Sequence, residues 1–129
     1  MADAVEGGTG QATVGQLSVA AEKRESSGRP CTVVSLTGRV DETERDQLRK
    51  ALHSAARRGP AFVLIDLSAV PSIDVTGVRE LVRVRAVMSG LGRVVALVSP
   101  SPGVAQFLES CGANQLMPVY PDVAAAMAG

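Results

Sequence analysis

Aromatic residues are almost absent from this chain. Its 129 residues include two phenylalanines, one tyrosine and no tryptophan, whereas apolar residues make up 46% of the total. The core must therefore be built from aliphatic side chains, which typically fill a sheet that is covered by helices. A single domain of this length can bury such a core without disulfides or metals.

The chain also lacks an excess of charge of either sign. Thirteen basic and thirteen acidic residues cancel, and there is no basic block or stripe of basic and aromatic residues. Phosphate contacts need concentrated positive charge, so a nucleic-acid partner is disfavoured. No apolar run is long enough to span a bilayer, and the N-terminus lacks the features of a signal peptide. We expect a soluble, cytoplasmic protein without a nucleic-acid or membrane partner.

Histidine and cysteine are too few for most catalytic or metal sites. His53 is the single histidine and is expected to be partly exposed on a helix. Cys31 and Cys111 form no metal-ligand pattern and are expected to be small buried apolar residues. A redox role for these two cysteines stays open as an alternative. We expect no metal, no cofactor and no enzymatic activity.

Hydrophobic periodicity predicts one domain over residues 17–129. Residues 1–16 are rich in Gly, Ala and Thr without periodicity and are predicted to form a disordered N-terminal arm. Strands are predicted over 17–25, 31–36, 62–65, 93–98 and 116–119, and helices over 41–58, 74–88, 102–111 and from Asp122 onward. This order predicts an α/β fold: a mostly parallel sheet of four to five strands, with an N-terminal hairpin strand, packed by about four helices.

Functional residues in such sheets gather in the loops beyond the carboxyl ends of the strands. These loops are predicted at 38–43, 66–77 and 99–102. In the second loop, Asp74 can accept hydrogen bonds from the free amides that begin the next helix. Gly77 costs helix stability at that position, which indicates close approach by another surface. A capped helix with an incidental glycine would explain the same residues without a binding site.

Residues 65–78, with the sequence IDLSAVPSIDVTGV, resemble the signature of the STAS domain. Anti-sigma factor antagonists share this domain with the cytoplasmic tails of sulfate transporters. In the family, an apolar strand ending in Asp-Leu-Ser is followed by an apolar residue, Asp, Ser, Ser or Thr, and Gly. Residues 36–41 (LTGRVD) resemble the family's Leu-Thr-Gly-Glu-Leu-Asp, and residues 99–112 resemble its third-helix region. The resemblance covers residues 17–127 and implies a STAS-type fold.

The resemblance implies partner switching in the regulation of transcription. In the family, a STAS protein binds an anti-sigma factor that is itself a serine kinase, and the sigma factor is released. Phosphorylation of the serine after the aspartate then breaks the complex, because it adds negative charge at the contact surface. We expect a monomer or weak homodimer whose partner-binding residues are Asp41, Asp74, Val75, Thr76, Gly77, Arg79 and Glu80. An ordinary solvated helix face would also explain Arg79, Glu80 and Arg83.

The sequence departs from the family where the phosphorylated serine is expected. Val75 occupies that position and has no hydroxyl group, and Thr76 follows it. Three interpretations stay open. Thr76 accepts the phosphate from a position rotated by about 100° around the helix, or the protein binds its partner without a switch, or it is a STAS scaffold in a stress-signalling complex under redox or oligomeric control.

An enzyme or nucleotide-binding protein is a further alternative. The chain lacks a glycine-rich phosphate loop and a nucleophile paired with a base. Asp41, Asp66 and Asp74 would have to meet at one sheet edge and bind Mg²⁺ to support this interpretation.

Overall fold

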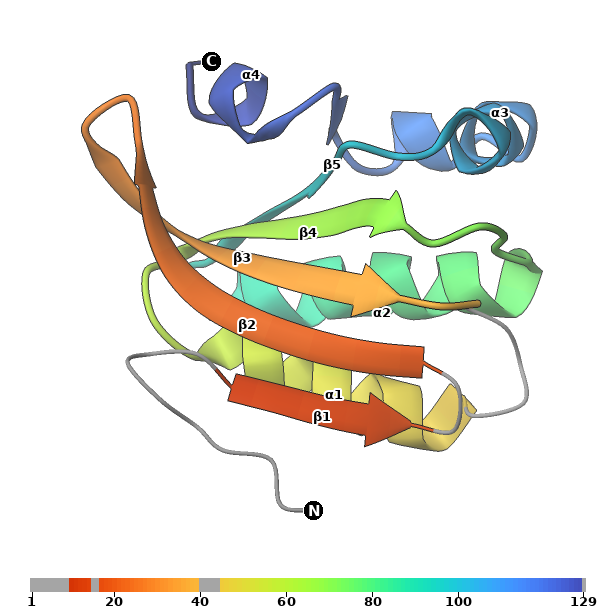
Figure 1. Cartoon of the computed structure of the whole chain (residues 1–129), viewed down its shortest axis with the longest axis horizontal. Helices are drawn as coiled ribbons and strands as arrows, with labels where there is room; N and C mark the ends of the chain where they lie inside the picture. Colours follow the sequence, from red (N-terminus) through yellow and green to blue (C-terminus); the bar gives the residue numbers. More distant parts are fainter. Residues whose placement is uncertain (1–9, 15–16, 40–44, 129) are drawn as a thin grey trace.

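The computed structural model describes residues 10–14, 17–39 and 45–128 (Figure 1). In this part of the chain, six strands form one sheet in the order β1-β2-β3-β4-β5-β6, which is also their order in the sequence. The strands are β1 (Gly10–Val14), β2 (Leu17–Ser26), β3 (Arg29–Thr37), β4 (Phe62–Ala69), β5 (Val94–Val98) and β6 (Val119–Tyr120). The first two pairings are antiparallel and the next three are parallel. The predicted α/β fold with an N-terminal hairpin is confirmed.

The strand β1 lies inside the segment for which a disordered arm was predicted. Its five residues pair with β2, from Gly10 opposite Ala21 to Val14 opposite Leu17. The hydrogen bonds of an antiparallel pair join main-chain groups, so a segment without apolar periodicity can still extend a sheet. The prediction of disorder is therefore wrong for residues 10–14, and the sheet has one strand more than the predicted maximum of five.

The turn between β2 and β3 consists of two residues with positive φ. Ser27 has φ 56° and Gly28 has φ 73°, between the paired residues Ser26 and Arg29. Two successive left-handed residues are typical of a type I′ turn, whose twist matches that of the flanking strands. The hairpin and its turn agree with the sequence prediction.

Helices connect the parallel strands and cover one face of the sheet. The helix α1 (Arg45–Arg57) follows β3, α2 (Val75–Gly90) follows β4, and α3 (Pro102–Ser110) follows β5. Figure 1 shows α1 and α2 side by side behind the sheet, where they pack against each other. The last helix, α4 (Val123–Ala128), packs on the opposite face. No helix among the described residues has the length and hydrophobicity that crossing a bilayer requires.

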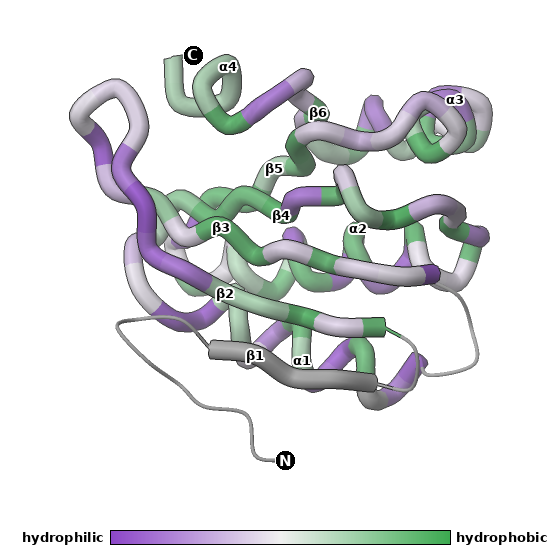
Figure 2. Tube along the Cα trace, in the orientation of Figure 1, coloured by the Kyte–Doolittle hydropathy of each residue, from purple (hydrophilic) through white to green (hydrophobic). Residues whose placement is uncertain are grey.

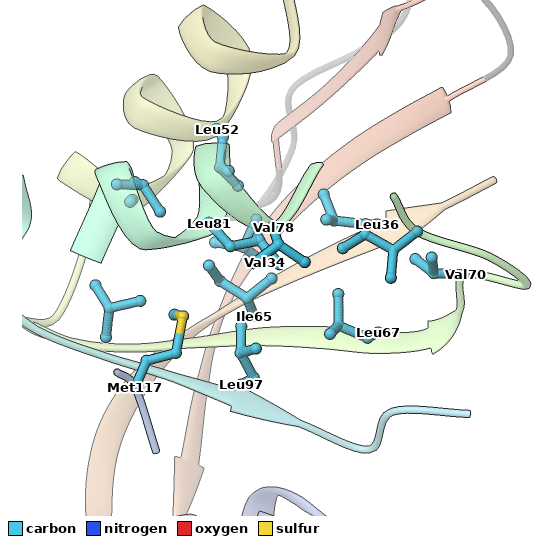
Figure 3. Close-up of a cluster of buried hydrophobic side chains, with 14 of the residues drawn as sticks. Val34, Leu36, Leu52, Ile65, Leu67, Val70, Val78, Leu81, Leu97 and Met117 are labelled. Carbon is cyan, nitrogen blue, oxygen red and sulfur yellow. The ribbon is translucent and has the colours of Figure 1, made fainter. Parts of the chain in front are cut away.

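Two apolar clusters lie on opposite faces of the sheet. The larger cluster is drawn in Figure 3, where Ile65 of β4 and Leu97 of β5 lie close to Val78 and Leu81 of α2. The smaller cluster, under α4, contains Cys31, Val33, Leu64, Ala96, Val98, Ala126 and Met127. The continuous apolar run of β4 is thus buried on both faces, as expected for a central parallel strand (Figure 2).

Arg93 holds the connection between α1 and β4. Its guanidinium nitrogens lie 2.9–3.0 Å from four main-chain carbonyl oxygens, those of Ala56, Arg58, Gly59 and Pro60. The last carbonyl groups of a helix have no hydrogen-bond partner within the helix. A cation at this end donates hydrogen bonds to them and interacts favourably with the negative end of the helix dipole. Buried Thr32 adds a hydroxyl that lies 2.9 Å from the carbonyl oxygen of Pro60. The end of α1 is therefore fixed to the sheet by side chains of β3 and of the segment before β5.

Gly59 is required in this connection. Its φ is +68°, a conformation that costs little for glycine and more for other residues. A Cβ atom on Gly59 would lie 2.9 Å from Oγ1 of Thr32. Both the backbone conformation and the packing therefore select glycine here.

The last strand, β6, is shorter than predicted and begins later. A 3-10 turn over Ala113–Gln115 precedes the predicted range 116–119, and residues 116–118 are in turn or irregular conformation. Met117 is buried there without strand pairing. The apolar run 116–119 therefore indicated burial correctly at Met117 but not at Leu116, which is 57% exposed, and it did not indicate the backbone conformation.

Candidate functional site

Three loops meet beyond the carboxyl ends of β3, β4 and β5, at the place predicted for a site. The amide of Gly38, after β3, donates a 3.0 Å hydrogen bond to the carbonyl of Ala69 at the end of β4. The hydroxyl of Ser101, after β5, donates a 3.0 Å hydrogen bond to the carbonyl of Val70. These bonds fix the loops around the start of α2.

The carboxylates of Asp66 and Asp74 both serve the local backbone. Asp66 accepts a 2.8 Å hydrogen bond from the amide of Ser68. Asp74 accepts a 2.9 Å hydrogen bond from the amide of Gly77 and caps α2, as predicted. Among the described residues, no three His, Cys, Asp or Glu side chains are grouped so that they could hold a metal ion. Asp41, a predicted contact residue and the third aspartate of the magnesium alternative, lies outside the described residues.

The first turn of α2 presents an apolar side chain to solvent. Val75, the first residue of the helix, is 51% exposed, and its neighbours Asp74 and Thr76 are half-buried. Val70 and Ile73 are buried beneath them and anchor the loop in the larger core. We call the surface formed by Asp74, Val75 and Thr76 the Asp74 corner. Val75 is one of five large apolar residues that are exposed among the described residues, and the one that lies at this edge of the sheet.

Gly77 and Glu80 do not belong to this exposed surface. Both are buried, and Glu80 is only 2% exposed. They lie on the side of α2 that packs against the rest of the domain, so the placement of Glu80 on an exposed face was wrong. Arg79 is exposed, as predicted.

The carboxylate of Glu80 forms a two-point ion pair across the two helices. Nε of Arg49 lies 3.0 Å from Oε1 of Glu80, and Nη2 lies 3.2 Å from Oε2. Arg83 approaches the same carboxylate at 3.7 Å. The hydrogen bond and negative charge of Glu80 raise the pKa of the Arg49 guanidinium. Sequence reasoning missed this pair because its members are 31 residues apart and meet only when α1 packs against α2.

His53 lies one helical turn after Arg49, in the same region between α1 and α2. Its Nε2 atom is buried and has no hydrogen-bond partner among the described residues. Burial lowers the pKa of His53, and the charges of Arg49, Arg57 and Arg83 lower it further, while Glu80 opposes them. His53 is therefore held in its neutral form more strongly than an ordinary surface histidine.

This lowered pKa predicts a loss of stability in acid. Above pH 6.5, the ordinary pKa of histidine, His53 is neutral in both the folded and the unfolded chain. Below it the unfolded chain takes up a proton more readily, so the free energy of unfolding falls as the pH drops toward the folded-state pKa. We expect His53→Gln to lose part of the decrease that urea denaturation records between about pH 8 and pH 5. An equal decrease in the variant would contradict this role.

The two cysteines have different environments. Cys31 is buried in the smaller core, as predicted, and burial raises the pKa of its thiol, with Arg24 acting in the opposite direction. Cys111 follows α3 and is exposed, which corrects the prediction that it is buried. Both thiols are free. A raised pKa disfavours the reactive thiolate, so the structure lends the redox interpretation no support at Cys31.

These observations define a class of protein: an α/β domain with a capped and exposed helix start at the carboxyl edge of a mostly parallel sheet. The chain belongs to the STAS domain family, whose family model matches residues 20–126. None of the curated proteins compared with the chain is similar to it.

Solved structures of STAS proteins share this fold. An anti-sigma factor antagonist (STAS) domain protein from Planctomyces limnophilus is 26% identical, with a TM-score of 0.67 over 84% of this chain and 98% of that one. An anti-sigma factor antagonist from Mycobacterium paratuberculosis is 22% identical, with a TM-score of 0.65 over 85% and 92% of the two chains. The murine Slc26a9 anion transporter is 16% identical, with a TM-score of 0.66, and the match covers 76% of this chain but 17% of the transporter.

Proposed function

We propose that this protein is an anti-sigma factor antagonist, which binds a serine-kinase-type anti-sigma factor in the cytoplasm and thereby frees a sigma factor. The observation that carries the proposal is the Asp74 corner, where Val75 is 51% exposed at a capped helix start. By the resemblance to STAS antagonists, Val75 stands where the phosphorylated serine of the family stands. Structurally similar proteins described as anti-sigma factor antagonists support the assignment.

A binding role suits the chemistry of the corner better than catalysis. The carboxylates of Asp66 and Asp74 are already used by backbone amides. The groups that remain available for contact with a binding partner are the apolar side chain of Val75 and the half-buried side chain of Thr76. Such a surface can bury apolar area against a partner but offers no nucleophile activated by a base.

The absence of a hydroxyl group at Val75 bears on regulation. A kinase cannot transfer phosphate to valine, so the usual charge switch cannot operate at this residue. We propose that the protein is an unswitched antagonist, which stays bound as long as its partner is present. The side chain of Thr76 points from a position about 100° further around the helix, which alters its approach to a kinase active site.

Binding is tested by titration calorimetry against the kinase-type anti-sigma factors of the same organism. Val75→Glu is expected to weaken binding by about 30-fold or more, because a charge replaces a central apolar contact. Val87→Glu is the matched control, since Val87 is also exposed and lies near the other end of α2. The proposal fails if no such anti-sigma factor binds, or if both variants bind as tightly as the unchanged protein. Oligomers in size-exclusion chromatography without kinase binding would favour the STAS scaffold.

The regulatory proposal is tested by adding ATP to the same mixtures and measuring intact mass. We expect no phosphate on the unchanged protein and one phosphate on the Val75→Ser variant, which restores a hydroxyl at the family position. Thr76→Ala serves as the control for the neighbouring hydroxyl. A phosphate on the unchanged protein that is lost in Thr76→Ala would show a switch at Thr76 and overturn the unswitched mechanism.

A further inference from the structure

The positive charge of this neutral chain is concentrated on two helices. The helices α1 and α2 carry seven of the thirteen basic residues of the chain but two of its thirteen acidic residues. The seven basic residues are Arg45, Arg49, Lys50, Arg57, Arg79, Arg83 and Arg85. No basic block is visible in the sequence because these residues are spread between positions 45 and 85. The helices α1 and α2 pack against each other on one side of the sheet (Figure 1). We call the side of these two helices that faces away from the sheet the basic helix face.

The acidic residues of the two helices leave most of this charge uncompensated. Glu80 is buried and pairs with Arg49 and Arg83, and Asp46 lies 3.7 Å from Arg45. Among the described residues, Lys50, Arg57 and Arg79 have no carboxylate within ion-pair distance. All three are exposed. Burial of the one inward carboxylate therefore leaves more basic than acidic side chains exposed on α1 and α2.

We propose that the basic helix face binds an acidic polypeptide segment. Six of its seven basic residues are arginines, whose planar guanidinium matches a carboxylate in a two-point contact. The pair of Arg49 and Glu80 already has this geometry on the same pair of helices. The proposed partner supplies Asp or Glu side chains to the free arginines and apolar side chains to Val87 and Leu91, which are exposed at the end of α2.

Two other polyanions fit the surface less well. Single-stranded nucleic acids gain affinity from stacking on aromatic side chains, and Phe62, Phe107 and Tyr120 all lie outside α1 and α2. Helices that lie in an anionic membrane surface insert large apolar residues such as Trp, Phe and Leu along one side. The apolar sides of α1 and α2 are instead packed on the sheet.

The part of the basic helix face on α1 is separate from the Asp74 corner, whereas Arg79 on α2 lies one helical turn from Val75. Lys50 and Arg57 lie on α1, and Arg57 ends that helix. Because α1 and α2 both run back from the carboxyl edge of the sheet, Arg57 lies at the end of the helix layer away from the corner. An acidic segment bound along α1 therefore adds a second binding function to the domain and does not depend on the proposed antagonist function.

The inference is tested with a fluorescein-labelled helical peptide rich in Glu and Leu, using fluorescence anisotropy at low ionic strength. Lys50→Glu combined with Arg57→Glu is expected to weaken peptide binding by about tenfold or more, and added salt should weaken binding to the unchanged protein. Lys23→Glu combined with Arg24→Glu is the matched control, because it changes the net charge equally at exposed positions of β2. We expect the control to lose less than about twofold in affinity.

Four results would overturn the inference. They are the absence of peptide binding to the unchanged protein, equal weakening in both double variants, tighter binding of phosphatidylserine vesicles, and tighter binding of a single-stranded oligonucleotide. Thermal unfolding of each variant shows whether the fold is retained. Titration of the Lys50→Glu, Arg57→Glu variant with the anti-sigma factors separates the two proposals. If the anti-sigma factor binds at the Asp74 corner, this double variant should still bind it.

Discussion

Replacing Arg93 with methionine is expected to lower the free energy of unfolding by about 3 kcal/mol. The guanidinium contacts four main-chain carbonyl groups at the end of α1 and in the connection to β4. Methionine retains much of the aliphatic stem but removes every donor, so the partly buried carbonyl of Ala56 loses its side-chain partner. The hydroxyl of Thr32 still lies within hydrogen-bond distance of the carbonyls of Arg58 and Pro60. Urea denaturation followed by circular dichroism measures the change. The favourable interaction between the Arg93 cation and the dipole of α1 is also lost, which lowers the free energy of unfolding further.

Arg79→Met is the matched control for Arg93→Met. Arg79 is exposed and makes no hydrogen bond or ion pair among the described residues, so its replacement should change stability by less than about 0.5 kcal/mol. Arg93→Lys should recover only part of the loss, because a single ammonium group cannot reach carbonyls that a planar fork reaches together. Equal stability of the Arg93→Met and Arg79→Met variants would show that Arg93 does not hold this connection.

Leu81→Ala is expected to cost about 3 to 4 kcal/mol. Leu81 is fully buried where α2 meets the sheet, close to Ile65 and Val78 (Figure 3). Truncation removes apolar burial and leaves a cavity between layers that are too rigid to collapse fully. The same denaturation experiment measures the effect, with the denaturant dependence of unfolding checked for any change in slope.

Leu91→Ala provides the comparison for the same chemical change at an exposed site. Leu91 follows α2 directly and is 55% exposed. Its truncation should cost less than about 0.5 kcal/mol. If Leu81→Ala were as mild as Leu91→Ala, the packing of α2 on the sheet would not be the main source of stability of the larger core.

The order and type of the main elements could be predicted because local signals agree with the fold. The continuous apolar run of β4 indicates burial on both faces, and the sheet places it at the centre. Asp74 at the start of α2 and Pro102 at the start of α3 mark helix beginnings that the structure has. In each case the cause lies within a few residues of the effect, so the sequence alone contains it.

Contacts between distant segments could not be predicted in the same way. From the sequence, Glu80 is expected to be a surface residue of an amphipathic helix. In the structure it is buried and its charge is paired with Arg49 from another helix. Cys111 has apolar neighbours in the sequence but lies at an exposed helix end. The strand β1 forms through main-chain pairing with β2 and leaves no periodic signal in its side chains. Each miss arises because tertiary packing decided the outcome.

The candidate site was predicted in part. The location beyond the carboxyl ends of the parallel strands follows from topology, and the structure brings the described parts of the three loops together there. The division of the segment into exposed Val75 and buried Gly77 depends on how α2 is rotated on the sheet. Helical periodicity constrains that rotation only loosely, because α2 buries Gly77 and Glu80 in addition to its large apolar residues.

The matching order of strands in the sheet and in the chain bears on synthesis of the protein. Each strand can pair with its predecessor soon after it leaves the ribosome, since its partner has already emerged. The helix α4 is the exception, because Arg29 in the early hairpin contacts the carbonyl of Met127, 98 residues later. A nascent chain therefore leaves Val33 and Leu64 uncovered on this face of the sheet until α4 has been synthesised.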